Sequence, residues 1–217
     1  MSPSPAVLAR IRLNPHHRAV QRDIHDADQM HKTLMRMVPD HLGDHARQQT
    51  GLLYRLDTDD DGHTLLVQAA HPLNTAGLPH GYGNADTREL APMFQALHDG
   101  LGVRYRIVVN PIKRERLSLD RKNERGRTLP LSGPDADQWW QRRATASGLQ
   151  LHTLTPHTIA PARSRTAKPG MRHSLIRYDG TATITDTHAL TNAVLTGIGR
   201  GKSYGAGLLS LAPAPTP

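Results

Sequence analysis

The sequence predicts an α+β protein built from two tandem βαββαβ units, the ferredoxin-like (RRM-like) arrangement. Three observations support this prediction. Strand and helix periodicities alternate in the same order twice, turn-forming residues separate them, and 217 residues are enough for two small domains. We expect the first unit over residues 1–115 and the second over 116–217. No repeat is visible residue by residue, so the predicted repetition concerns architecture alone.

The first half opens with a clear strand and a clear helix. In residues 6–13, small and branched apolar side chains alternate with Arg10 and Arg12, as in a half-buried strand. Residues 27–38 carry an apolar stripe at helical spacing, with Asp26 or Asp28 as the N-cap. The other elements expected here are strands at 51–57 and 63–70 around a DTDDDG turn, a loop at 71–85, a weak helix at 86–99 and a strand at 102–110.

The second half repeats this order more loosely. Its clearest element is a helix over 135–147, in which Trp139 and Trp140 are expected to be core residues. Residues 113–127 are basic and polar, and we expect a linker or an exposed hairpin. The remaining expected elements are a short strand near 127–131, a strand at 149–159, an open segment at 160–171, a strand at 172–185, a helix at 187–196 and a strand at 206–212.

The composition favours a polyanionic partner. The chain has 27 Lys and Arg against 19 Asp and Glu, a formal net charge of +8 and a pI of about 10.3. Such a surplus favours nucleic acid, because each neutralised phosphate releases a counterion. One Phe, two Trp and five Tyr are few for a protein that stacks many single-stranded bases, so we expect recognition of backbone and shape.

Several classes of protein are excluded or disfavoured. The absence of cysteine excludes disulfides, zinc ribbons and thiolate nucleophiles, and it fits a cytoplasmic location. No signal peptide or membrane-spanning segment is expected, so we expect no membrane partner. His41 and His45 have i,i+4 spacing, but the segment lacks the glutamate of the H-E-x-x-H zinc motif. We therefore expect neither a metal nor another cofactor.

A glycine-rich segment lies near the C-terminus. Residues 197–207, GIGRGKSYGAG, let the backbone approach a ligand closely, and Arg200 and Lys202 add positive charge. The segment ends like a nucleotide-binding P-loop, but Thr196 stands where the first glycine of that motif belongs. Two interpretations remain open: an RNA-contacting loop, or a tight helix-to-strand connection that needs glycine for steric reasons.

Four short motifs, in this order, resemble a known family. They are Met30–Leu34 (MHKTL), Val109–Lys113 (VNPIK), Tyr178–Gly180 (YDG) and the segment GIGRGKSYGAGLLSLAP. Together they resemble the CRISPR-associated repeat-processing ribonucleases, and more narrowly the CasE family of type I-E systems. The resemblance covers nearly the whole chain, although residues 39–50, 71–100 and 160–171 look unrelated.

The resemblance implies both a fold and an activity. Such proteins have two ferredoxin-like domains and bind the stem-loop of a CRISPR repeat transcript. They cut at the base of the hairpin without a metal and keep the mature guide RNA as a Cascade subunit. The 2′-hydroxyl of the RNA is the nucleophile, which leaves a 2′,3′-cyclic phosphate and a 5′-hydroxyl. The alternatives are a non-catalytic RNA-hairpin-binding subunit of the same fold and a DNA-binding or general nucleic-acid-binding module.

The resemblance also implies site residues. His31 matches the family's catalytic histidine, as general acid or general base. Some relatives carry a tyrosine three residues earlier, where this chain has Asp28, interpreted here as a helix cap; this leaves the second proton carrier open, with His25 as a candidate. Lys168, and after it Arg172, are candidates to stabilise the transition state, unless their loop only binds phosphate. The residues expected to bind RNA are Lys113, Arg114, Arg116, Arg121, Lys122, Arg125, Arg127, Gly199, Arg200, Gly201, Lys202 and Ser203.

Overall fold

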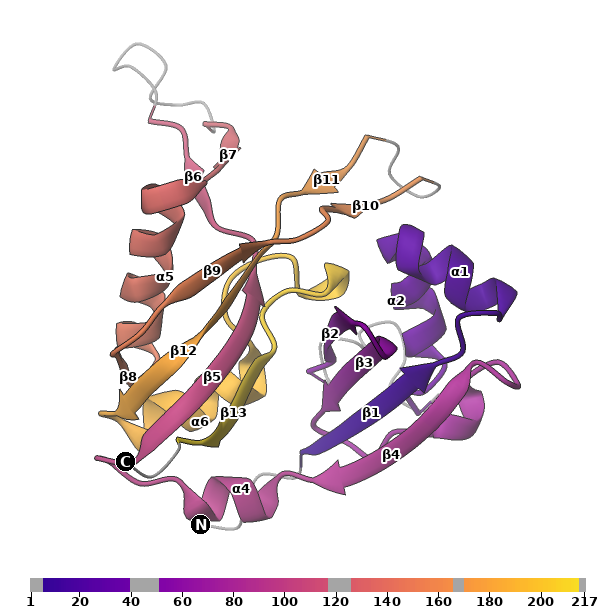
Figure 1. Cartoon of the computed structure of the whole chain (residues 1–217), viewed down its shortest axis with the longest axis horizontal. Helices are drawn as coiled ribbons and strands as arrows, with labels where there is room; N and C mark the ends of the chain where they lie inside the picture. Colours follow the sequence, from indigo (N-terminus) through magenta and orange to yellow (C-terminus); the bar gives the residue numbers. More distant parts are fainter. Residues whose placement is uncertain (1–5, 40–50, 117–125, 166–169, 215–217) are drawn as a thin grey trace.

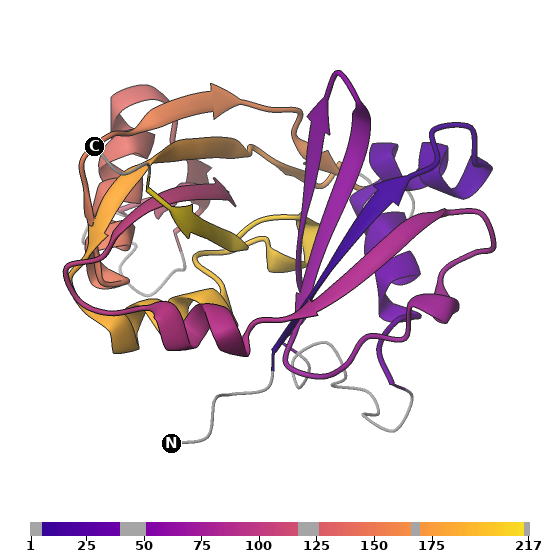
Figure 2. The same ribbon diagram turned by 60° about the horizontal axis from the view of Figure 1, so that its bottom comes forward.

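The computed structural model describes residues 6–39, 51–116, 126–165 and 170–214. Two antiparallel sheets, one from each half of the chain, lie side by side (Figure 1). Figure 2 shows helices α1 and α2 on the side of the first sheet that faces away from the second half. None of the helices within these ranges is long and apolar enough to cross a membrane.

The first sheet has the strand order β2-β3-β1-β4. Its third strand lies between the second and the first, and its fourth flanks the first. Ile11 in the central strand faces Leu65 on one side and Ala85 on the other. The elements of this half are β1 (Val7–Leu13), α1 (Arg18–His25), α2 (Ala27–Met35), β2 (Leu53–Asp59), β3 (Gly62–Ala69), a 3₁₀ turn η2 (Thr75–Gly77) and β4 (Gly83–Glu89).

The second sheet repeats this order as β13-β5-β12-β8, and β9 pairs with β12 beside β8. Here too the third strand, β12, lies between the second and the first, and the fourth flanks the first. The same topology therefore occurs twice, and the prediction of two tandem ferredoxin-like units is confirmed. The elements are β5 (Gly102–Val109), α5 (Gly133–Ala146), β8 (Leu149–Leu151), β9 (Thr155–Thr158), β12 (Ile176–Ile184), α6 (Thr187–Thr196) and β13 (Leu209–Pro213).

Each half has its own apolar core between its sheet and its helices. In the first half Ile11, Leu34 and Leu65 are fully buried. In the second, Trp139 and Trp140 are buried as expected, and the indole N–H of Trp140 donates to the Tyr105 hydroxyl at 3.3 Å. The burial of this apolar area is the main favourable term in the stability of each half.

Two short hairpins extend from the second half, at the same end of the molecule (Figure 1). The first consists of β6 (Ile112–Arg114) and β7 (Thr128–Pro130), which pair at the two ends of the segment 113–127 for which a linker or an exposed hairpin was predicted. The second consists of β10 (Ala162–Arg163) and β11 (Arg172–His173), within what we expected to be an open segment and the start of a longer strand.

The pairing of β5 corrects the expected division of the chain. The strand at 102–110 was expected in the first unit, yet β5 lies between β12 and β13 of the second sheet. The two sheets therefore divide between Glu89 and Gly102, and not at residue 115. Periodicity indicates that a segment is a strand, but it does not indicate the sheet to which the strand belongs.

One local prediction was wrong, and one helix was not predicted. The weak helix expected at 86–99 is the end of β4 followed by a short helix, α4 (Ala91–Ala96). Because β4 is an edge strand with mostly exposed side chains on both faces, it lacks the alternation that identifies a half-buried strand. Helix α1 was not expected, because it is polar and buries only Val20 and Asp23.

Candidate functional site

Some of the residues singled out from the sequence lie around helix α2, which carries His31. This helix packs against the η4 turn (Lys202–Tyr204) of the glycine-rich segment and against β10. In Figure 1 the β10–β11 hairpin, η4 and helices α1 and α2 surround the junction between the two halves. The site is therefore assembled from both halves of the chain.

Asp26 fixes the start of α2 and ties it to the second hairpin. Its Oδ1 accepts the backbone N–H groups of Asp28 at 3.0 Å and Gln29 at 3.3 Å, which makes Asp26 the N-cap. Its Oδ2 accepts the backbone N–H of Arg165, just beyond β10, at 3.1 Å. One buried carboxylate thus joins the helix to the hairpin across a separation of 139 residues.

Asp28 is not the cap of α2, which corrects our interpretation. It lies inside the helix, its residue is only 9% exposed, and no hydrogen-bond donor in the described ranges reaches its buried Oδ2. His31 follows one turn later and is half-buried, with its Nδ1 atom inside the protein. His25 lies at the end of α1, exposed, with its Nδ1 at 2.7 Å from the Gln21 carbonyl. The two candidate histidines are therefore on different helices.

The glycine-rich segment packs against Tyr54 of β2. The Tyr54 hydroxyl donates to the Ser203 carbonyl at 3.2 Å, and a Cβ on Gly205 would lie 3.2 Å from the Tyr54 ring. Gly205 has φ +83°, which L side chains rarely adopt. Burial raises the pKa of the Tyr54 hydroxyl, and the nearby Tyr204 and Asp28 raise it further, so the hydroxyl remains a donor.

The glycines and Lys202 make close contacts within the protein. A Cβ on Gly199 would lie 3.1 Å from the Trp139 ring. The Lys202 ammonium donates to the Thr196 carbonyl at the end of α6, at 2.6 Å. Arg200 is exposed, and its backbone forms a bridge with Asn110 beyond the end of β5.

A small aromatic cluster beside the loop was not predicted. The Asn110 amide lies 3.0 Å from Nδ1 of His173 on β11, and the His173 ring centroid lies 5.0 Å from that of Tyr204. Asn110 is buried and belongs to a motif that carries the family resemblance. Nothing in the local sequence around His173 indicated a contact 63 residues away.

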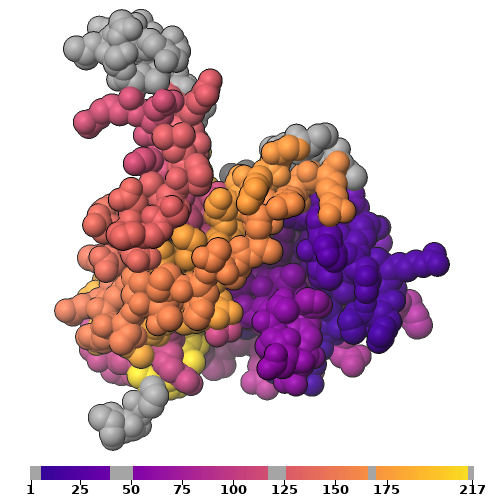
Figure 3. All heavy atoms as spheres, turned by 45° about the horizontal axis from the view of Figure 1, so that its top comes forward, coloured from indigo at the N-terminus to yellow at the C-terminus, as the bar shows by residue number. Residues whose placement is uncertain are grey.

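The basic residues lie mainly on the two hairpins. Arg172 and Arg163 face each other across the β10–β11 pair, and both are exposed. Lys113 lies 3.8 Å from Asp135 of α5. Figure 3 shows the β10–β11 hairpin lying against the N-terminal helices, while the β6–β7 hairpin projects away from the body. Also exposed on the first hairpin are Arg114, Arg116 and Arg127. The predicted residues Arg121, Lys122, Arg125 and Lys168, and also His41 and His45, lie outside the described ranges.

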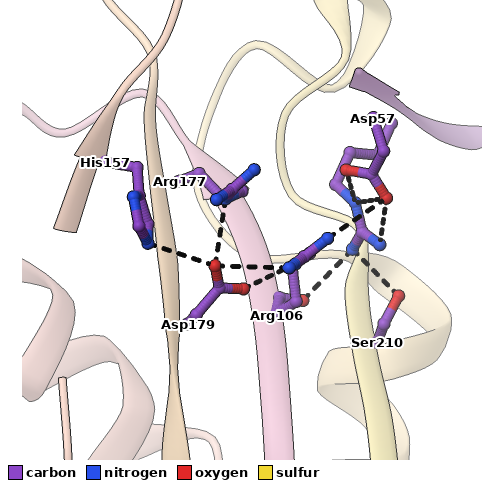
Figure 4. A network of polar contacts seen from close by, with 7 residues as sticks. Asp57, Arg106, His157, Arg177, Asp179 and Ser210 are labelled. Atoms are coloured by element: carbon purple, nitrogen blue, oxygen red, sulfur yellow. Dashed lines mark hydrogen bonds and ion pairs between the residues drawn. The ribbon is translucent and has the colours of Figure 1, made fainter. Parts of the chain in front are cut away.

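A polar network holds the two sheets together below this site (Figure 4). The Arg55 guanidinium on β2 pairs with Asp57, donating through Nε at 2.9 Å and through NH2 at 2.9 Å. Its NH1 donates to the Arg106 carbonyl at 3.2 Å and to the Ser210 hydroxyl at 2.9 Å, both in the second sheet. Arg106 also pairs with Asp179, which in turn contacts Arg177 and His157.

A cavity of about 420 Å³ lies at the same junction. Apolar side chains such as Met30 and Leu175 line much of it, and Asp57, Arg163 and Arg177 supply charge. Within the described residues, no group of three or more His, Asp or Glu side chains is arranged to hold a metal ion.

Comparisons with known proteins agree with this architecture. A family model described as "CRISPR associated protein" matches residues 7–213. The "CRISPR-associated endoribonuclease Cse3" of Thermus thermophilus is 27% identical over 221 residues, covering 95% of this chain and 99% of Cse3. Its solved structure bound to an RNA representing a pre-cleavage complex has a TM-score of 0.79 at 25% identity, covering 96% of this chain and 100% of that chain.

Two further relatives are components of larger assemblies. The "CRISPR system Cascade subunit CasE" of Escherichia coli K12 is 30% identical over 201 residues, covering 90% of this chain and 95% of CasE. A chain of a solved "CRISPR RNA-guided surveillance complex, pre-nicking" is 38% identical, with a TM-score of 0.70, covering 96% of this chain and 100% of that chain.

Proposed function

The chain belongs to the CRISPR-associated protein family, within the CasE group of type I-E systems, and we infer from this premise that it is a repeat-processing endoribonuclease of Cascade. Its partners are the CRISPR repeat RNA and the other Cascade subunits. The observation that carries the proposal is the packing of α2, with His31, against a basic hairpin and a glycine-rich loop.

The chemistry that suits this site is attack by the RNA's own 2′-hydroxyl. The 2′-oxygen bonds to the adjacent phosphorus, the bond from phosphorus to the 5′-oxygen breaks, and a 2′,3′-cyclic phosphate remains. In our proposal His31 protonates the leaving 5′-oxygen, and His25 is the candidate acceptor of the 2′-hydroxyl proton. Arg172 and Lys168 are the candidates for holding the negative charge of the transition state.

Binding of the hairpin would rest on the phosphate backbone. The exposed cations of the β6–β7 hairpin stand away from the body, and those of the β10–β11 hairpin border α2. A structured RNA that spans both hairpins places the base of its stem near His31. Since cleavage at the base of the stem leaves the hairpin and its phosphates intact, the mature guide RNA keeps these contacts and stays bound. We also propose a cytoplasmic location, because the transcript is made there.

A non-catalytic RNA-binding subunit is the second candidate. The observation that favours it is Asp28, which stands where some relatives carry a catalytic tyrosine. Both candidates predict tight binding of the repeat hairpin, and only the first predicts cleavage.

Incubation of the purified protein with its labelled repeat hairpin in EDTA separates these candidates. We expect the wild-type protein to cut once and to leave a cyclic phosphate, identified by mass spectrometry of the product ends. His31→Ala should abolish cutting while hairpin affinity stays within a few-fold, and the matched control His188→Ala, an exposed histidine on α6, should cut normally. Binding without cutting by the wild type would favour the second candidate, and normal cutting by His31→Ala would refute the assignment of His31. Competition with duplex DNA at matched salt tests the preference for RNA.

A further inference from the structure

Asp28 is a buried carboxylate without an assigned role. It is 9% exposed, and no donor of the described residues reaches its Oδ2 atom. The cap of α2 is Asp26, whose two carboxylate oxygens accept three backbone N–H groups, so capping does not explain Asp28. A buried carboxylate oxygen without a donor is costly, so each such group calls for an explanation, and a role in the chemistry of a site is one of them.

Asp28 shares a helix face with His31. Residues three apart on an α-helix have Cβ atoms about 5–6 Å apart and face each other. Both residues have an atom inside the protein, Oδ2 of Asp28 and Nδ1 of His31. The two side chains therefore start from neighbouring positions on the helix, and a carboxylate within about 4–6 Å of an imidazole favours the protonated ring.

We propose that Asp28 is a positioning residue that stabilises the imidazolium form of His31 and so keeps it ready as a general acid. The inference rests on the proposed function, in which His31 donates a proton to the leaving 5′-oxygen. Asp28 itself forms no bond to the substrate. Some relatives carry a tyrosine at the position of Asp28. In this protein the same position holds a carboxylate, and our proposal is that its charge acts on His31.

Two neighbouring groups that could otherwise act on His31 or Asp28, those of Asp23 and Tyr54, are engaged with other partners. From α1, the Asp23 carboxylate is occupied by Arg22 at 2.7 Å and by the Tyr82 hydroxyl at 2.9 Å. From β2, the Tyr54 hydroxyl donates to Ser203, so it does not neutralise Asp28. The other titratable or charged groups on elements packed against this part of α2 are His25 from α1, Tyr204 and Lys202 from η4, and Arg163 and Arg165 from the β10 segment, with Asp26, Lys32 and Arg36 on α2 itself.

The test measures the pKa of His31 directly, by NMR titration of histidine-labelled protein without RNA. The His31 signal is assigned with His31→Gln. We expect Asp28→Asn, which keeps the shape and removes the charge, to lower that pKa by at least about one unit. Asp28→Glu, which keeps the charge, should restore most of the shift. The control Asp60→Asn makes the same chemical change in the exposed β2–β3 turn and should leave the pKa of His31 unchanged.

The pH dependence of the cleavage rate gives a second test of the proposal. The alkaline limb of the pH–rate profile of Asp28→Asn should move to lower pH by the same amount, so that cleavage at pH 8 falls about tenfold for a shift of one unit while hairpin affinity holds. A role in folding alone would lower the rate at every pH and would not move the limb. A pKa of His31 in Asp28→Asn within about 0.2 of the wild-type value overturns the proposal. If the wild type does not cut RNA, the function fails, but the titration still decides the inference.

Discussion

Arg55 offers a direct test of how the two halves are held together. Its side chain is only 3% exposed, and among the described residues its polar contacts are with Asp57 on its own strand and with Arg106 and Ser210 in the second sheet (Figure 4). Arg55→Met keeps the length and apolar stem of the side chain and removes the charge and every donor. It also leaves Asp57 without its closest cation.

The expected cost of this change is about 3 kcal/mol. Removal of one partner from a buried ion pair costs about 3–5 kcal/mol, because the remaining charge stays desolvated. The lower end applies here, because the Asp57 side chain is 16% exposed and Arg106 lies 3.9 Å away. With an m-value of roughly 3 kcal/mol per molar urea, the unfolding midpoint should fall by about 1 M.

Urea unfolding followed by circular dichroism measures this shift. The matched control is Arg10→Met, which breaks the exposed pair with Asp86 and should cost less than about 1 kcal/mol. The double variant Arg55→Met/Asp57→Asn no longer has the unpaired Asp57 carboxylate, so it should be more stable than Arg55→Met alone. A midpoint for Arg55→Met within about 0.2 M of the wild type would refute the reasoning that this guanidinium joins the halves.

Three further outcomes follow from the structure. Asp26→Ala removes the cap of α2 and the contact with Arg165, so it should cost about 1–2 kcal/mol in urea unfolding and should slow cleavage; an unchanged midpoint would contradict the role of the cap. Gly205→Ala forces a side chain into a left-handed φ against Tyr54 and should destabilise the protein by about 1–2 kcal/mol, measured the same way. Lys113→Gln and Arg114→Gln should each reduce the slope of log affinity for the hairpin against log salt by about one, without a change in cleavage position; a slope that does not move would remove the β6–β7 hairpin from the interface.

Elements with a strong one-sided apolar pattern were predictable from the sequence. The strand at 6–13, the helix at 27–38 and the tryptophan-bearing helix at 135–147 each expose one face and bury the other, and each lies close to its expected place. The repetition of the same element order was enough to predict two ferredoxin-like halves, because few arrangements bury the apolar faces of such a series.

Elements without such a pattern were not predictable. Edge strand β4 and polar helix α1 expose most of their side chains, so burial leaves little trace in their composition. The assignment of β5 to the second sheet depends on its pairing with β12 and β13, far along the chain. Local periodicity contains no information on such partners.

Some features of the candidate site were also predictable from local sequence, and others were not. The motif was enough to predict His31 as a candidate, whereas the sequence left Asp26 and Asp28 undecided as the cap of α2, and only the structure shows that the cap is Asp26. Arg55 is in an alternating strand, where an arginine predicts a solvent-facing position, yet it is buried. Its burial is understandable only from Ser210 and the Arg106 carbonyl, which lie 155 and 51 residues away.

These long-range contacts have a common consequence for the chemistry. His31 is carried by the first half, whereas Arg172, β10 and the glycine-rich segment belong to the second. In-line cleavage requires a geometry in which a displacement of about 1 Å can cost a hundredfold in rate. The geometry of the site therefore depends on the interface between the two halves. Its contacts include the hydrogen bonds from Arg165 to Asp26 and from Tyr54 to Ser203, and the Arg55 network. The directional hydrogen bonds of these polar residues fix the relative position of two apolar cores, which the cores alone do not determine.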